Sequence, residues 1–196
     1  MRGAFPRLED ERMSNSDFDA FVKRQQAKKH EEAAFDPRKQ LEEWLGHLDA
    51  LYKQATKFLE TYVQNGSAQI EYREIELNEE FSGPYSAREM LLKIGSSTIT
   101  FTPIGTMLIG MKGRVDVQGP LGSARLNLVN KDVSYARQLV QVAVTIAGQP
   151  RSAPQPAAAT RKIEWAWKIA TPPPEMRFID LTKETFFNMV LSVADA

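Results

Sequence analysis

The stretch that decides the fold runs from residue 36 to residue 75: DPRKQLEEWLGHLDALYKQATKFLETYVQNG (36–66), then SAQIEYREI (67–75). In the first part, apolar side chains recur at alternating spacings of three and four, the period of a helix with one apolar seam. In the second part the spacing becomes two, since Ile70 and Tyr72 are each followed by a charged residue. This change predicts a helix followed by a β-sheet. The seam consists of Leu41, Trp44, Leu48, Leu51, Ala55, Phe58 and Tyr62.

Both ends of the helix carry recognisable signals. Asp36 can cap the first turn, and Pro37 suits the first helical position because its missing N–H would have no partner there. Asn65 and Gly66 form a stop signal, which predicts a helix over residues 37–65. Additional apolar residues widen the seam beyond a coiled-coil line, so packing on a sheet or in a bundle is expected. These are Leu45, Tyr52, Leu59 and Val63.

The best-defined pair of strands surrounds the turn residues 119–122, Gly-Pro-Leu-Gly. With Pro120 and Leu121 at the centre of the turn, Val117 lies opposite Ala124, Asp116 opposite Arg125 and Val115 opposite Leu126. Asp116 and Arg125 would then form a cross-strand ion pair of about 0.2 to 1 kcal/mol. Connections this short predict antiparallel strands, since parallel strands need long crossovers.

Other segments complete an α+β fold. Further strands are expected over 90–94, 98–102, 140–146, 163–169 and 176–180, and residues 148–160 have no period and predict a loop. A helical conformation of 135–139 remains open. Thr182 can cap a last helix over 183–195. We therefore expect N-terminal helices, one of them long, packed with a meandering antiparallel sheet or partly open barrel of about seven strands, closed by the C-terminal helix.

The domain organisation follows from the same patterns. Residues 36–196 should form one α+β domain, with its sheet over 67–180. Residues 1–35 should form a disordered or exposed helical arm: Ser16 can cap a helix, but the segment from Val22 to Glu32 is almost wholly polar and has little to pack with. Such a helix is expected to order on a partner.

Composition excludes several kinds of protein. Basic and acidic side chains number 25 each, so the net charge is zero, whereas nucleic-acid binders usually carry a basic domain or stripe. The absence of cysteine excludes disulfides, thiolate metal sites and a cysteine nucleophile. Because no stretch has the apolar length of a signal peptide or membrane span, we expect a cytoplasmic protein.

No metal or cofactor site is predicted. The sequence has two histidines, His30 and His47. Glu43 and His47 are four residues apart and could share a metal ion, but the neighbouring turns supply no third ligand, so a surface pair is the better interpretation. Carboxylates also cluster along residues 71–80, where a solvated edge strand is more plausible than paired acid–base catalysts. Five glycines between 105 and 122 lack the spacing of a phosphate-binding loop and suit turns and bends.

Two groups of residues are candidates for a ligand or partner surface. Trp165 and Trp167 lie on one face of an expected strand and could stack on a ligand, although the flanking Ile163 and Ile169 favour a place in the core. The second group shares one face of the expected hairpin, and such a polar face is usually the solvated side of an antiparallel sheet. It consists of Arg114, Asp116, Arg125 and Asn127.

Two functions from different classes remain. The first is a non-enzymatic protein-interaction or oligomerisation module, in which the N-terminal helices bind a second copy of the chain or another protein. The alternative is a small-ligand-binding domain or an enzyme that uses a polar pocket on the sheet. It would require a buried concave site with at least two of Arg114, Asp116, Arg125, Glu71 and His47 within hydrogen-bonding distance.

Overall fold

The computed structural model describes residues 18, 19, 22, 36–80, 82–106, 110–139 and 163–194 of the chain. Two compact units, Met1–Gln40 and Leu41–Ala196, divide the chain inside the first turns of helix α2 (Pro37–Gln64). A second helix, α3 (Lys183–Ala194), follows the last strand, and a short 3-10 helix, η1, spans Ala136–Gln138. No helix in the described part of the chain is both long and apolar enough to cross a membrane.

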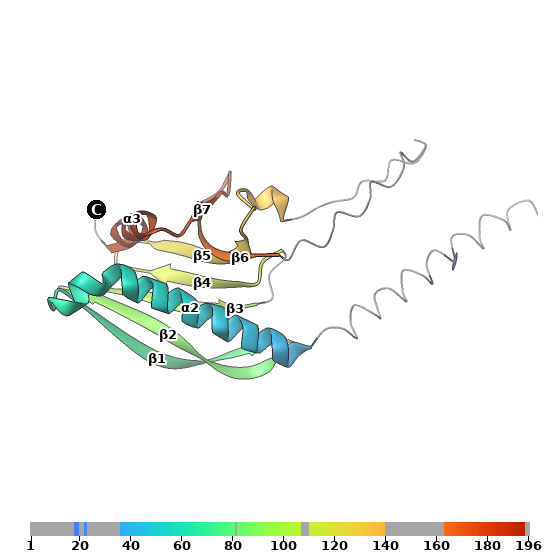
Figure 1. Cartoon of the computed structure of the whole chain (residues 1–196), viewed down its shortest axis with the longest axis horizontal. Coiled ribbons are helices and arrows are strands. Elements are labelled where there is room, and N and C mark those ends of the chain that lie inside the picture. Colours follow the sequence, from blue (N-terminus) through green and yellow to red (C-terminus); the bar gives the residue numbers. More distant parts are fainter. Residues whose placement is uncertain are drawn as a thin grey trace, which may run out of the picture. The chain divides into compact units, whose positions relative to one another are not determined.

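Seven antiparallel strands form one open sheet, in which the order across the sheet is the order along the chain (Figure 1). The predicted α+β fold is thereby confirmed, with an open sheet and not a closed barrel. The outermost strands are β1 and β7. The strands are β1 (Ala68–Glu79), β2 (Gly83–Ile94), β3 (Ser97–Gly105), β4 (Gly113–Gln118), β5 (Ser123–Asn130), β6 (Trp165–Ala170) and β7 (Phe178–Asp180).

The ends of α2 lie where the sequence signals place them. The carboxylate of Asp36 accepts hydrogen bonds from the backbone N–H groups of Arg38 (3.0 Å) and Lys39 (3.3 Å), which have no partner inside the helix. At the other end, Gly66 adopts a left-handed conformation with φ of 77°, which disfavours a residue with a side chain. The helix ends at Gln64, one residue before the predicted limit.

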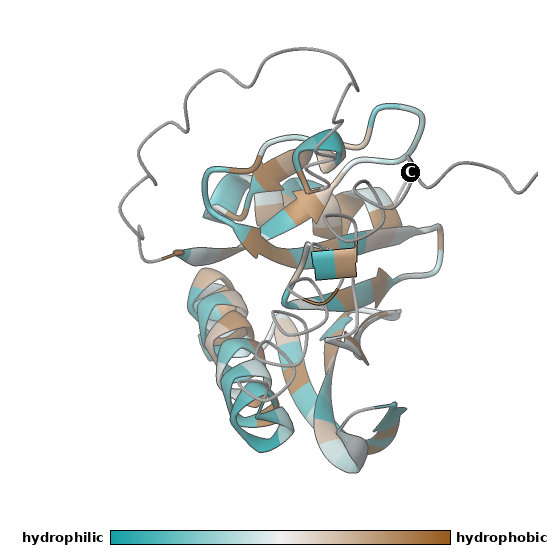
Figure 2. Cartoon of the chain, turned by 90° about the vertical axis from the view of Figure 1, so that its right-hand side faces the viewer, coloured by the Kyte–Doolittle hydropathy of each residue, from teal (hydrophilic) through white to brown (hydrophobic). Residues whose placement is uncertain are grey.

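The core lies between one face of the sheet and the two helices. Helix α2 carries both hydrophobic and hydrophilic residues (Figure 2). Its buried residues include Trp44, Leu48 and Leu51. Helix α3 packs on the same core, because the ring of Phe186 lies 5.6 Å from that of Phe58 in α2 and 6.1 Å from that of Phe101 in β3. The widened seam of α2 therefore packs on a sheet, as expected.

The predicted hairpin register is confirmed: Val117 pairs with Ala124, Asp116 with Arg125 and Val115 with Leu126. The predicted ion pair is wrong. Asp116 accepts two hydrogen bonds of 2.6 Å from Arg114 on its own strand, and no ion pair joins it to Arg125 among the described residues. Arg114 lies two positions away on the same face, where its planar guanidinium can hold both carboxylate oxygens.

Some expectations fall partly or wholly outside the described residues. The strand expected over 140–146 and the loop over 148–160 lie there, as does most of the N-terminal arm, in which Phe18, Asp19 and Val22 are described and helical. The strand expected over 90–94 is longer than predicted, because β2 begins at Gly83 and pairs along its whole length with β1. The last helix begins at Lys183, and the Thr182 hydroxyl caps it by accepting a hydrogen bond from the N–H of Thr185 (3.2 Å).

Candidate functional site: a groove between the long helix and the first two strands

The two predicted tryptophans occupy different environments. Trp167 is 8% exposed, its indole N–H donates to the carbonyl of His47 (3.0 Å), and its ring centroid lies 5.9 Å from that of Trp44. Trp165 is half-buried, and the ammonium of Lys112 lies 5.3 Å from its ring centroid. Trp167 is therefore part of the core, and only Trp165 retains surface that could contact another molecule.

The four polar candidates lie on the sheet face opposite the helices. Arg114 pairs with Asn127 and Asp116 with Arg125, whereas the alternate residue Val115 lies in the core. The hydrogen bonds from Arg114 to Asp116 raise the pKa of the guanidinium and leave the pair with little net charge. Arg125 is exposed, and the buried side-chain oxygen of Asn127 has no hydrogen-bond partner in the described structure.

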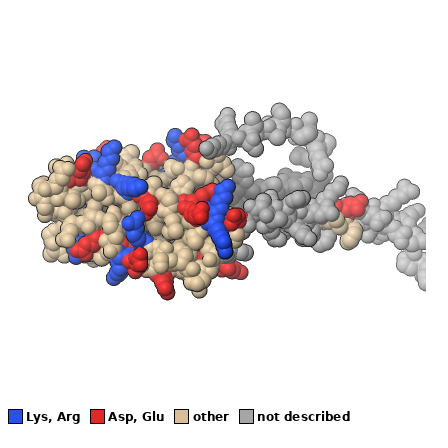
Figure 3. Space-filling model, turned by 60° about the horizontal axis from the view of Figure 1, so that its bottom comes forward, with Lys and Arg blue, Asp and Glu red and all other residues tan. Residues whose placement is uncertain are grey.

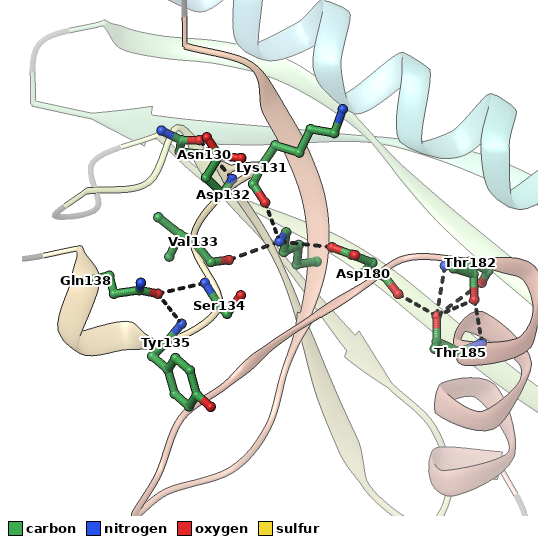
Figure 4. Close-up of polar contacts among 11 residues, drawn as sticks. Asn130, Lys131, Asp132, Val133, Ser134, Tyr135, Gln138, Asp180, Thr182 and Thr185 are labelled. Atoms are coloured by element: carbon green, nitrogen blue, oxygen red, sulfur yellow. Dashed lines mark hydrogen bonds and ion pairs between the residues drawn. The ribbon is translucent and has the colours of Figure 1, made fainter. Parts of the chain in front are cut away.

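Other charges on this face also have neighbouring partners. The buried ammonium of Lys168 donates to the carbonyls of Lys131 (2.7 Å) and Val133 (3.0 Å) and lies 2.9 Å from the carboxylate of Asp180 (Figure 4). Buried Glu89 is bound by Arg73 and accepts a hydrogen bond from the Thr102 hydroxyl (2.6 Å). These contacts join adjacent strands, which is a structural role for the face.

Glu43 and His47 both lie near the ammonium of Lys112. The carboxylate of Glu43 is bound by the ammonium of Lys112. Burial, and then the charge of Lys112, lower the pKa of the His47 imidazole. Within the described ranges, no group of three or more His, Cys, Asp or Glu side chains is placed to hold a metal ion.

A cavity of about 570 Å³ lies between α2 and the strands β1 and β2. We call it the α2–β1 groove. Its lining comes from one side of α2 and from two strand residues that lie beneath the helix. The lining residues are Asp49, Tyr52, Lys53, Thr56, Lys57, Glu60, Tyr72 and Arg88.

Two tyrosines form the base of the α2–β1 groove. The buried hydroxyl of Tyr52 donates to the carbonyls of Arg88 (2.7 Å) and Phe101 (3.3 Å), and burial raises the pKa of this phenol further above neutrality. The Tyr72 ring lies 5.7 Å from that of Tyr52 and is 45% exposed. Tyr52 therefore joins the helix to the sheet, whereas Tyr72 offers an aromatic surface to a ligand.

The charges of the α2–β1 groove are unequally partnered. Arg88 lies 2.5 Å from the carboxylate of Asp49 and covers the Tyr72 ring at 5.4 Å. Lys53 and Lys57 are exposed on successive turns of α2, and neither ammonium has an ion-pair partner within the described part of the chain. Two basic groups thus remain available beside the exposed ring of Tyr72. Acidic and basic groups are interspersed over the side of the molecule that Figure 3 shows.

A second cavity of about 230 Å³ continues the α2–β1 groove, because Asp49 and Arg88 line both. Its other lining residues are Leu45, Leu48, Glu74, Ser86 and Ala87. The two cavities together follow α2 on one side and β1 and β2 on the other. Since β1 is the outermost strand and β2 is its one neighbour among the described strands, the groove runs beside a free sheet edge.

None of the residues that line the α2–β1 groove belonged to a candidate site predicted from the sequence. The sequence identified residues 71–80 as a solvated edge strand and Tyr52 as part of the helix seam. The one local signal was the pair Lys53 and Lys57, which lie four apart on the polar side of α2 and therefore on neighbouring turns. Their proximity to Tyr72 depends on how the helix crosses the sheet, which spacing along the chain does not reveal.

Comparisons of this chain with protein-family models, with curated proteins and with solved structures found no match.

Proposed function

We propose that this chain is a non-enzymatic protein-interaction module that binds an extended segment of a partner protein along the free edge of β1. The observation that carries this proposal is the position of a 12-residue edge strand beside the α2–β1 groove. Main-chain hydrogen bonds to a sheet edge provide affinity, and pockets for alternate side chains provide specificity.

The dimensions suit such a ligand. A strand of 12 residues extends about 40 Å at roughly 3.3 Å per residue. Successive side chains of a bound strand would point to opposite faces of the sheet, so every second one would enter the groove beneath α2. Tyr72 would provide a large, rigid contact surface at its centre, and tyrosine is among the residues that most often dominate interface energies.

The chemistry of the groove supports binding more than catalysis. The Tyr52 hydroxyl is buried in hydrogen bonds and its raised pKa makes it a poor general base. The charges of Arg88 and Asp49 offset one another. None of the lining residues that the structure describes is a histidine.

The composition of β1 supports a partner other than a second copy of the same strand. Glu71, Glu74 and Glu76 lie along this edge, and pairing of two β1 strands would gather many carboxylates at one junction. Charged residues on an edge strand commonly prevent such self-pairing. Self-association through residues 1–35 is a separate proposal within the same functional class, supported by the almost wholly polar stretch between Val22 and Glu32, which has little to pack with inside one chain.

The test uses heptapeptides displayed on phage and selected for binding to the full chain. Synthetic copies of selected peptides should perturb the backbone amide NMR signals of residues 68–79. Tyr72→Ser should weaken their binding by more than about tenfold, because it removes an aromatic contact from the centre of the site.

Tyr62→Ser is the matched control, because Tyr62 is also 45% exposed and also contacts one aromatic ring, that of Phe187. This variant should bind within about twofold of the unmodified chain, a difference of less than half a kcal/mol. Equal binding by both variants, or amide shifts confined to other strands, would contradict the proposal.

A further inference from the structure

We infer that the segment bound by the α2–β1 groove carries an acidic side chain opposite Tyr72, held between the ammonium groups of Lys53 and Lys57. This inference rests on the proposed function and names the chemistry of its partner. It is motivated by the juxtaposition of two lysines on α2, neither of which has an ion-pair partner among the described residues, with an exposed aromatic side chain on the edge strand.

The position of the acidic side chain follows from the groove. The Tyr72 hydroxyl lies 3.4 Å from that of Thr56, which belongs to the same stretch of α2 as the two lysines. Side chains directly opposite one another on neighbouring strands have their Cβ atoms about 4.5 to 5.5 Å apart. A partner side chain opposite Tyr72 would therefore enter the groove on the Lys53 and Lys57 side.

The remaining charges of the groove do not cancel this preference. Asp49 is bound to Arg88, and Glu60 accepts a long hydrogen bond of 3.4 Å from Gln64, one turn further along α2. With Arg88 and Asp49 offsetting one another, Lys53 and Lys57 outnumber Glu60. An acidic side chain would form hydrogen bonds with two charged donors, which are stronger than hydrogen bonds between neutral groups.

The site formed by Lys53 and Lys57 is accessible to a polypeptide segment and not only to a small ion. Because the free edge of β1 borders the groove, a carboxylate on an added strand can reach the lysines while its backbone pairs with the sheet. We therefore assign the site to an acidic residue of a partner protein. Free inorganic phosphate is the competing occupant that the experiment separates.

The experiment uses the selected heptapeptides and the full chain. We expect glutamate or aspartate to recur at one position of the peptides. Replacing that residue by its amide should weaken binding by about tenfold, and added salt should weaken binding of the original peptide as ionic interactions are screened. The double variant Lys53→Glu, Lys57→Glu should no longer bind the original peptide. It should bind a peptide in which the acidic residue is replaced by lysine.

The control for total charge is the double variant Arg38→Glu, Lys39→Glu, which changes two basic residues of α2 outside the groove and places acids in the first turn, where helices favour them. It should bind like the unmodified chain. If the charge-reversed groove variant fails to fold, Lys53→Gln, Lys57→Gln provides the same comparison without charge reversal.

The inference would be overturned by selected peptides without a recurrent acid, by equal binding of the acidic and amide peptides, or by equal binding by the groove and control variants. Lysine-dependent binding of inorganic phosphate alone, with no effect of peptide charge, would also overturn it. In each case, if Tyr72→Ser still weakens peptide binding, the proposed interaction at the β1 edge stands and only the acidic-residue inference fails. If Tyr72→Ser has no effect on peptide binding, the proposed function and the inference both fail.

Discussion

At the scale of single residues, Gly113 in β4 leaves no room for a side chain beside Trp44. A Cβ atom added at Gly113 would lie 2.0 Å from the Trp44 ring, which is buried between α2 and the sheet. The indole cannot move away easily, because it packs against Trp167 and belongs to the main core. Glycine is therefore required at this point of β4 by the approach of a side chain and not by its backbone conformation.

We predict that Gly113→Ala lowers the free energy of unfolding by about 1 to 3 kcal/mol, the usual cost of overpacking a core. Gly46→Ala is the control, because a Cβ at this exposed helical position meets nothing within 4 Å. That change should be neutral or should stabilise the protein by up to about 1 kcal/mol, since alanine is the better helix former. Urea denaturation of both variants measures the difference, and equal stability would contradict the packing described here.

At the scale of secondary-structure elements, the start of α2 depends on one side chain. The Asp36 carboxylate satisfies two backbone N–H groups of the first turn. We predict that Asp36→Ala lowers the free energy of unfolding by about 0.5 to 2 kcal/mol, whereas Asp36→Asn, which keeps an accepting oxygen, changes it by much less. Chemical denaturation measures both. Equal losses in the two variants would show that the charge, and not the cap, is responsible.

At the scale of the whole molecule, the chain separates into a compact unit, Leu41–Ala196, and the residues that precede it. No residue before Leu41 belongs to the main core among the described positions. Most of the apolar side of α2 is buried in that core, and Tyr62 and Val63 near its C-terminal end are exposed. Self-association through residues 1–35 would therefore leave the buried side of α2 in place.

We predict that light scattering of the full chain gives the mass of a dimer or larger assembly, and that deletion of residues 1–35 converts it to a monomer. The truncated chain should still unfold cooperatively in urea, because the core is retained. Its free energy of unfolding should be lower than that of the full chain by no more than the stabilisation that self-association provides. A full chain that is monomeric at high micromolar concentration would contradict self-association and leave the peptide-binding proposal untouched.

Several features could be predicted from the sequence because they depend on near neighbours along the chain. The cap at Asp36, the glycine stop at Gly66 and the register around the turn at 119–122 all follow from local backbone geometry and short-range pairing. The candidate groove could not be predicted in the same way. Tyr72 and Arg88 lie on different strands, and their meeting with α2 depends on the angle and position at which the helix crosses the sheet.

The sequence by itself determined that a long helix precedes an antiparallel sheet and that Val115 and Val117 share one sheet face while Asp116 lies on the other, since periods of 3.6 and 2 record the two backbone geometries directly. Only the tertiary structure decided that Trp167 packs on Trp44, that Asp116 binds Arg114 and not Arg125, and that Lys53 lies beside Tyr72. These pairings arise where layers meet or where one charged side chain has several possible partners. Periodicity specifies the face of an element, but not what covers that face.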